Sequence, residues 1–114
     1  MSYDLAFWEG PPPRDHEEAL ARYEEIWDDL DDIEETIPPN PAIQALIVEL
    51  ESRWPATDPN APWAMFPLGG QDAQGGTLYV NLVSATPDEY IEFMAAAARR
   101  LGLVCFDPQV HRVL

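Results

Sequence analysis

Lysine is absent from the sequence, and only six arginines stand against 21 aspartates and glutamates. The 114 residues therefore carry a formal net charge of −15 with neutral histidines. A protein that follows nucleic-acid phosphates or lies on anionic lipid needs clustered cations. We predict that this protein binds neither nucleic acid nor a membrane surface.

Cysteine and long apolar runs are also scarce. Cys105 is the single cysteine, which excludes a disulfide framework and a multi-cysteine zinc site within the chain. No stretch approaches the 18 or so apolar residues of a membrane-spanning helix. The first residues lack the cationic start and apolar run of a secretory signal. These absences predict a cytoplasmic protein.

The apolar content is sufficient for one core. The sequence is 46% hydrophobic and 11% aromatic, and its length is the usual size of one domain. We expect residues 1 to 114 to form a single domain that folds alone.

The acidic residues are concentrated in the first third of the chain, where residues 1 to 35 hold 13 of the 21 carboxylates. The densest run has six candidate partner-binding residues: Asp28, Asp29, Asp31, Asp32, Glu34 and Glu35. Two interpretations remain open, a solvated helix face that keeps the protein soluble and a patch that contacts a basic partner. The second is favoured because neighbouring like charges destabilise the helix that carries them.

Capping residues and apolar periodicity predict three helices and about four strands. The helices are expected to start at Asp15, Asn40 and Thr86 as caps, and to end near residues 30 to 34, at Pro55 and at Gly102. The expected strands are 3 to 9, 63 to 68, 77 to 83 and 103 to 106, with a turn-rich loop at 69 to 76.

This order of elements predicts an α+β fold with a small antiparallel or mixed sheet. Strands 63 to 68 and 77 to 83 are expected to pair antiparallel, and the helices to cover one face of the sheet. The nearest named arrangement is the ferredoxin-like sandwich, with one helix inserted between its first two strands.

Two ligand-binding loops are incomplete in the sequence. A calcium loop starting at Asp28 would have Ile33 in place of its glycine and Pro39 in place of its final glutamate. Residues 70 to 77 differ at one position from the phosphate-loop pattern, with Gly76 in place of the lysine. We expect neither metal nor phosphate to bind there.

Catalytic patterns are equally weak. A triad of Cys105, Asp107 and His111 would lie on one extended segment, whose side chains point to alternating faces. His16 and His111 have no recognisable zinc-ligand spacing. We therefore expect no enzyme activity, no catalytic residue, no metal and no cofactor.

The four tryptophans fall into two groups. Trp27 and Trp54 lie on apolar helix stripes and are expected in the core. Trp8 and Trp63 stand at strand ends beside glycine or proline, where a partly exposed indole is a candidate protein contact.

Three segments carry a resemblance: Met1 to Gly10, the pairings at Trp54-Pro55 and Ala61 to Trp63, and Gly102 to Gln109. They resemble a family of small, acidic, uncharacterised bacterial proteins. Proteins of this kind are similar to the immunity proteins of polymorphic toxin and contact-dependent inhibition systems. The resemblance transfers no functional residue by motif.

The expected function is therefore that of a cytoplasmic immunity protein, which neutralises a basic toxin domain, such as a nuclease, through the acidic run. Two alternatives remain. One is a small enzyme or ligand-binding domain with a pocket between sheet and helices, and the other is a dimerising structural module. We expect a monomer or a weak homodimer.

Overall fold

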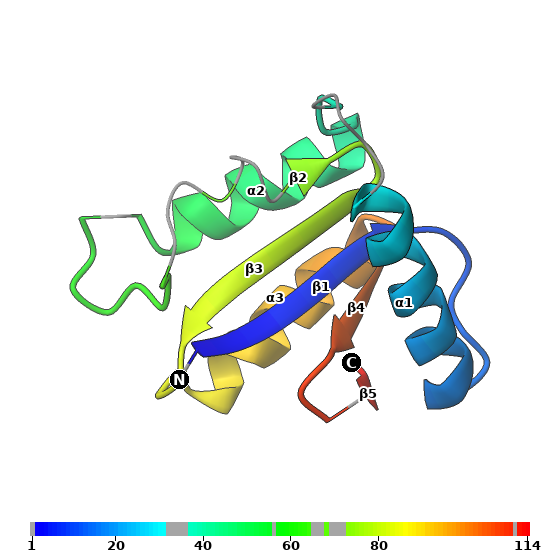
Figure 1. The fold of residues 1–114 in the computed structure, drawn as a ribbon. Helices are drawn as coiled ribbons and strands as arrows, with labels where there is room; N and C mark the ends of the chain where they lie inside the picture. The colour runs from blue at the N-terminus through cyan, green and yellow to red at the C-terminus, as the bar shows by residue number, and fades with distance from the viewer. Residues whose placement is uncertain (1, 32–36, 56, 65–67, 69–72, 111) are drawn as a thin grey trace.

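The structure is a computed structural model, and it describes residues 2 to 31, 37 to 55, 57 to 64, 68, 73 to 110 and 112 to 114 (Figure 1). The helices of these segments are α1 (His16–Asp31), α2 (Pro41–Arg53) and α3 (Asp88–Arg100). The strands are β1 (Ser2–Glu9), β2 (Ala73–Gln74), β3 (Thr77–Val83), β4 (Leu103–Asp107) and β5 (Arg112–Val113).

The strands form one antiparallel sheet in the order β2-β3-β1-β4-β5, which places the N-terminal strand at the centre. Trp8 of β1, for example, lies between Thr77 of β3 and Val104 of β4. The predicted α+β fold is confirmed. The order β2-β3-β1-β4 is that of the ferredoxin-like plan, to which β5 adds an edge strand.

Helices lie on both faces of the sheet, so the expectation that they cover one face is wrong. Leu5 and Phe7 of β1 pack in the core that contains α2 and α3, whereas Ala6 and Trp8 pack in a second core with α1. In Figure 1, α3 runs behind β1 while α1 lies on the viewer's side. A strand buried at four consecutive positions needs cover on both faces. That signal was present in the run from Leu5 to Trp8.

An aromatic cluster holds α1 against the sheet. The ring of Phe106 in β4 lies 5.2 Å from Tyr23 of α1 and 5.7 Å from Trp8 of β1, between ring centroids. Trp27 lies 5.4 Å from the ring of Tyr79 in β3. Trp8 is only 2% exposed, which contradicts the prediction of a partly exposed contact residue at the end of β1.

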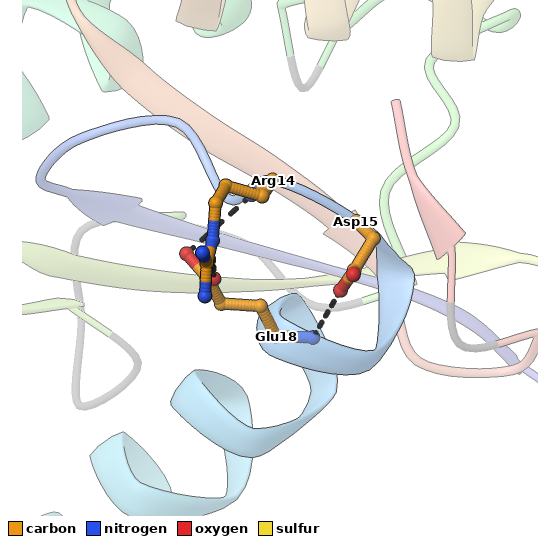
Figure 2. A network of polar contacts seen from close by, with 3 residues as sticks. All are labelled: Arg14, Asp15 and Glu18. Carbon is orange, nitrogen blue, oxygen red and sulfur yellow. Dashed lines mark hydrogen bonds and ion pairs between the residues drawn. The ribbon is translucent and has the colours of Figure 1, made fainter.

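The start of α1 follows the predicted capping sequence (Figure 2). The Asp15 carboxylate accepts the backbone N–H of Glu18 at 2.8 Å. The Glu18 carboxylate turns back to Arg14, whose Nε donates to it at 2.8 Å. The predicted cap is confirmed, although Glu18 bonds to Arg14 rather than to the backbone of Asp15 as in a complete capping box.

The start of α2 is attached to the turn between β2 and β3. Asn40 caps the helix by accepting the N–H of Ile43 at 3.0 Å, and its own N–H donates to Gly75 O at 2.8 Å. The Asn40 amide also donates to the carboxylate of Glu9 at the end of β1. Gly75 has a φ of 54°, a conformation that favours glycine.

Three local predictions need correction. Of the expected antiparallel pairing between 63 to 68 and 77 to 83, the described residues show one antiparallel bridge, Trp63 to Leu82, and residues 65 to 67 lie outside them. The hairpin partner of β3 is β2, within the segment expected to be a loop. The strand β5 was not expected in the tail. Thr86 does not cap α3, because its hydroxyl donates to Val83 O and leaves Pro87 as the cap residue.

Candidate functional site

The structure places the predicted acidic run at the end of α1. Asp28 and Asp29 lie in its last turns, and both are exposed. Asp31 is the last residue of the helix, and its side chain is not described. Asp32, Glu34 and Glu35 lie outside the described residues. The structure therefore brings together the first two of the six predicted contact residues.

The exposed carboxylates extend further along α1 than the predicted run. We use the name acidic surface for Glu17, Glu24, Glu25, Asp28 and Asp29, all of which are exposed. The steps of seven and four residues from Glu17 to Glu24 and Asp28 place these three on one stripe of the helix. The helical spacing of Glu17, Glu24 and Asp28 in the sequence already indicates this stripe. The predicted contact residues were instead chosen from the densest acidic run, at the C-terminal end of α1.

Of the two arginines of the N-terminal segment, Arg22 contacts one carboxylate of this surface and Arg14 contacts Glu18 outside it. Arg22 lies 2.8 Å from Glu25, and Arg14 lies 2.8 Å from Glu18. Among the described residues, no ion pair or hydrogen bond reaches the carboxylates of Glu17, Glu24, Asp28 or Asp29. These four negative charges therefore face solvent without a contacting cation in that part of the chain.

The acidic surface weakens the helix that carries it. Glu24 and Asp28 are four residues apart, as are Glu25 and Asp29, and like charges at this spacing cost about 0.2 to 0.5 kcal/mol per pair. The last turn of α1 has no basic residue. Carboxylates at that end also oppose the helix dipole. Within the described residues, Glu24, Asp28 and Asp29 therefore have no contact that offsets this cost.

A further carboxylate lies on the same side of the sheet as α1. Asp4 of β1 has a buried Oδ1 atom to which the described residues give no hydrogen-bond partner. Burial raises the pKa of the nearby Tyr79 hydroxyl, and the charges of Tyr23 and Asp4 raise it further. The Asp4 carboxyl group thus lies close to Tyr23 of α1. Sequence reasoning did not single it out.

Two of the groups considered for catalysis or metal binding, Asp107 and His16, make hydrogen bonds within the fold. The carboxylate of Asp107, 2% exposed, accepts the Tyr3 hydroxyl and the backbone and side-chain N–H groups of Gln109. His16 accepts the N–H of Val113 through Nδ1 at 3.1 Å. His111 lies outside the described residues. Within the part of the chain that is described, no three His, Cys, Asp or Glu side chains gather as a metal site would require.

Cys105 contributes stability that should disappear in alkali. Burial, with a smaller effect of the Asp107 charge, raises the pKa of its thiol from 9.0 to about 12. An unfolded thiol ionises near pH 9, so this contribution is complete below pH 9 and is lost as the pH rises toward 12. Urea unfolding at increasing pH should show the loss, with a shallower fall in Cys105→Ala.

The same burial should protect the thiol from reagents at neutral pH. We expect the native protein to react with Ellman's reagent far more slowly than the chain unfolded in urea, because the thiolate is the reacting species. Equal rates in both states would contradict the buried position of Cys105.

Comparison of the chain with protein-family models, curated proteins and solved structures finds no match. Of the helices in the described segments, none has the length and apolarity needed to cross a membrane. The function must therefore be argued from the site itself.

Proposed function

We propose that this protein is a non-catalytic binding protein that uses the acidic surface of α1 to capture a basic protein. In this proposal it is a cytoplasmic immunity protein, and its partner is a toxin domain with a cationic surface, such as a nuclease. The supporting observation is that Glu17, Glu24, Asp28 and Asp29 are exposed and contact no cation among the described residues, on a helix whose other side is packed on the sheet.

Long-range electrostatic attraction to a cationic partner is one use of such a surface. A nuclease must present cations to its nucleic acid, and a neutraliser with a dense negative surface associates with it faster. Steering of this kind raises association rates toward about 10⁸ to 10⁹ M⁻¹s⁻¹ at low salt. An immunity protein needs this speed because an uncaptured toxin damages the cell. The bound complex would also need desolvated apolar contacts for its final affinity.

The arrangement of α1 suits this role. Its aromatic side packs on Phe106 and Tyr79, so the carboxylates are presented on a fixed support rather than on a flexible tail. A partner then meets preorganised charges and loses less conformational entropy on binding.

The proposal is tested with the reading frame immediately upstream of the one that encodes this chain. Its C-terminal domain, expressed alone in a bacterial host, should arrest growth, and co-expression of this protein should restore it. The purified pair should form a complex whose affinity falls as salt is raised. A toxic upstream domain that is neither bound nor neutralised would contradict the proposal.

The carboxylates of the acidic surface should lower the free energy of unfolding through their mutual repulsion. Glu24→Lys replaces a repulsive i,i+4 pair with an attractive one toward Asp28. We expect it to raise the free energy of unfolding by about 0.5 kcal/mol at low salt, with Glu24→Gln gaining about half as much. Urea unfolding at low and high NaCl measures this. A loss of stability would mean that Glu24 serves the fold.

A further inference from the structure

A pocket of about 480 Å³ opens beside the C-terminal end of α3. Its volume lies in the range of small-molecule sites, about 300 to 1,000 Å³. Three segments far apart in the sequence meet here: the proline-rich turn after β1, the passage from α3 into β4, and Leu114. The lining residues that matter to the argument are Pro12, Pro13, Arg99, Leu103 and Leu114.

The walls are mainly apolar, and Arg99 has the one charged side chain among the residues that line the pocket. Three of the last backbone carbonyls of α3 already accept hydrogen bonds. Leu101 N–H donates to Ala97 O and Ala98 O, and Gly102 N–H donates to Arg99 O. The Arg99 guanidinium is therefore the charged side-chain group that the pocket offers to a ligand.

Arg99 is one of three arginines, with Arg53 and Arg112, that have no contacting acid in the described segments. Arg14, Arg22 and Arg100 form ion pairs with Glu18, Glu25 and Glu49, and Arg53 lies 4.9 Å above the ring of Trp54. The protein has 21 acidic side chains and six arginines, so an arginine that lines an apolar pocket without a contacting acid is unusual.

The edge of β4 supplies a second recognition element. Leu114 N–H bonds to Cys105 O, so Cys105 directs its backbone groups away from β1. In an antiparallel strand, backbone direction repeats every second residue, and Leu103 therefore directs its N–H and C=O to the same outer edge. Among the described residues, β5 pairs with β4 at Phe106 and Asp107. Leu103 thus borders the pocket with backbone groups on an edge that β5 does not pair there.

From this combination we propose that the pocket binds a small carboxylate with an apolar body. The carboxylate lies on the Arg99 guanidinium, whose planar fork matches it, and the apolar body lies against Pro12, Pro13 and Leu114. The net negative charge of the protein does not forbid this, because charges more than about 8 Å away are largely screened at physiological salt. This ligand site is separate from the acidic surface and independent of its proposed partner.

The proposal is tested by titrating the protein with hexanoate and following backbone amide chemical shifts. We expect saturable binding in the millimolar range, with the largest shifts at Gly102, Leu103 and Leu114. Arg99→Gln should weaken it at least 10-fold, since hydrogen bonds to charged groups are the strong ones. Arg100→Gln is the matched control, because Arg100 neighbours Arg99 but pairs with Glu49 outside the pocket. It should leave binding unchanged.

Two sources of this ligand chemistry are distinguished by a second pair of probes. A peptide ending in Leu-Leu with a free C-terminus is compared with the same peptide amidated. Tighter binding of the free peptide than of hexanoate identifies a protein C-terminus as the ligand, because it can also pair with Leu103. The reverse order identifies a free aliphatic acid. Absence of saturable binding by both probes overturns the proposal, and so does equal binding by Arg99→Gln and the native protein.

Discussion

Changing Glu24, Asp28 and Asp29 together to lysine is expected to abolish capture of the basic partner while the protein stays folded. The three side chains are exposed and make no ion pair within the described segments, so no contact of the fold is removed. Each substitution adds two positive charges to the formal −15, which leaves −9. We expect the association rate to fall by about 10 to 1,000-fold and the affinity by at least 100-fold.

The matched control reverses three acids on the other side of the sheet. Asp88, Glu89 and Glu92 are exposed on α3, and changing them to lysine gives the same net charge of −9. Surface plasmon resonance at two salt concentrations would compare both variants. If the acidic surface of α1 is the contact, only the α1 variant loses the partner. Equal losses would mean that total charge alone matters, and unchanged binding by the α1 variant would contradict the assigned surface.

Stability separates a binding defect from unfolding in this comparison. Lysines near the end of α1 suit the helix dipole, whereas lysines in the first turn of α3 oppose it. The α1 variant should therefore be the more stable of the two, and yet the one that fails to bind.

The sequence was informative where local rules decide the structure. The Asp15 and Asn40 caps form as expected, because each needs only residues within one turn of its own helix. Asp28 and Asp29 are exposed at the end of α1, as both interpretations of the acidic run required. Trp54, placed in the core by the same period, is 1% exposed and stacks on Tyr90 at 4.6 Å.

Features that depend on distant segments were missed. The face on which α1 packs depends on contacts with distant residues, among them Phe106, about 80 residues further along the chain than Tyr23. The turn at Gly75 looked like a free loop, but Ile37 N–H donates to the Gln74 side chain and ties the turn to the start of α2. The pocket around Arg99 arises from three segments, and no motif in any one of them indicates it.

Phe106→Ala is expected to cost about 3 to 5 kcal/mol of the free energy of unfolding, the range for truncating a fully buried phenylalanine. Phe106 is 0% exposed, and its ring contacts both Tyr23 of α1 and Trp8 of β1. The substitution leaves a cavity between helix and sheet that the surrounding strands cannot close without moving α1. Urea unfolding measures the loss, and Val110→Ala is the control, because Val110 is 63% exposed and should change stability by less than about 0.5 kcal/mol.

The defect should be uneven across the molecule, because the two cores use opposite faces of β1. Phe106 belongs to the core under α1, whereas α2 and α3 pack with Leu5 and Phe7 on the other face. At low denaturant, hydrogen exchange in Phe106→Ala should accelerate more at α1 amides than at α3 amides. Partner binding should fall with it, because the acidic surface keeps its charges but loses its support. A cost below about 1 kcal/mol, or equal acceleration in both helices, would contradict the packing of α1 on Phe106.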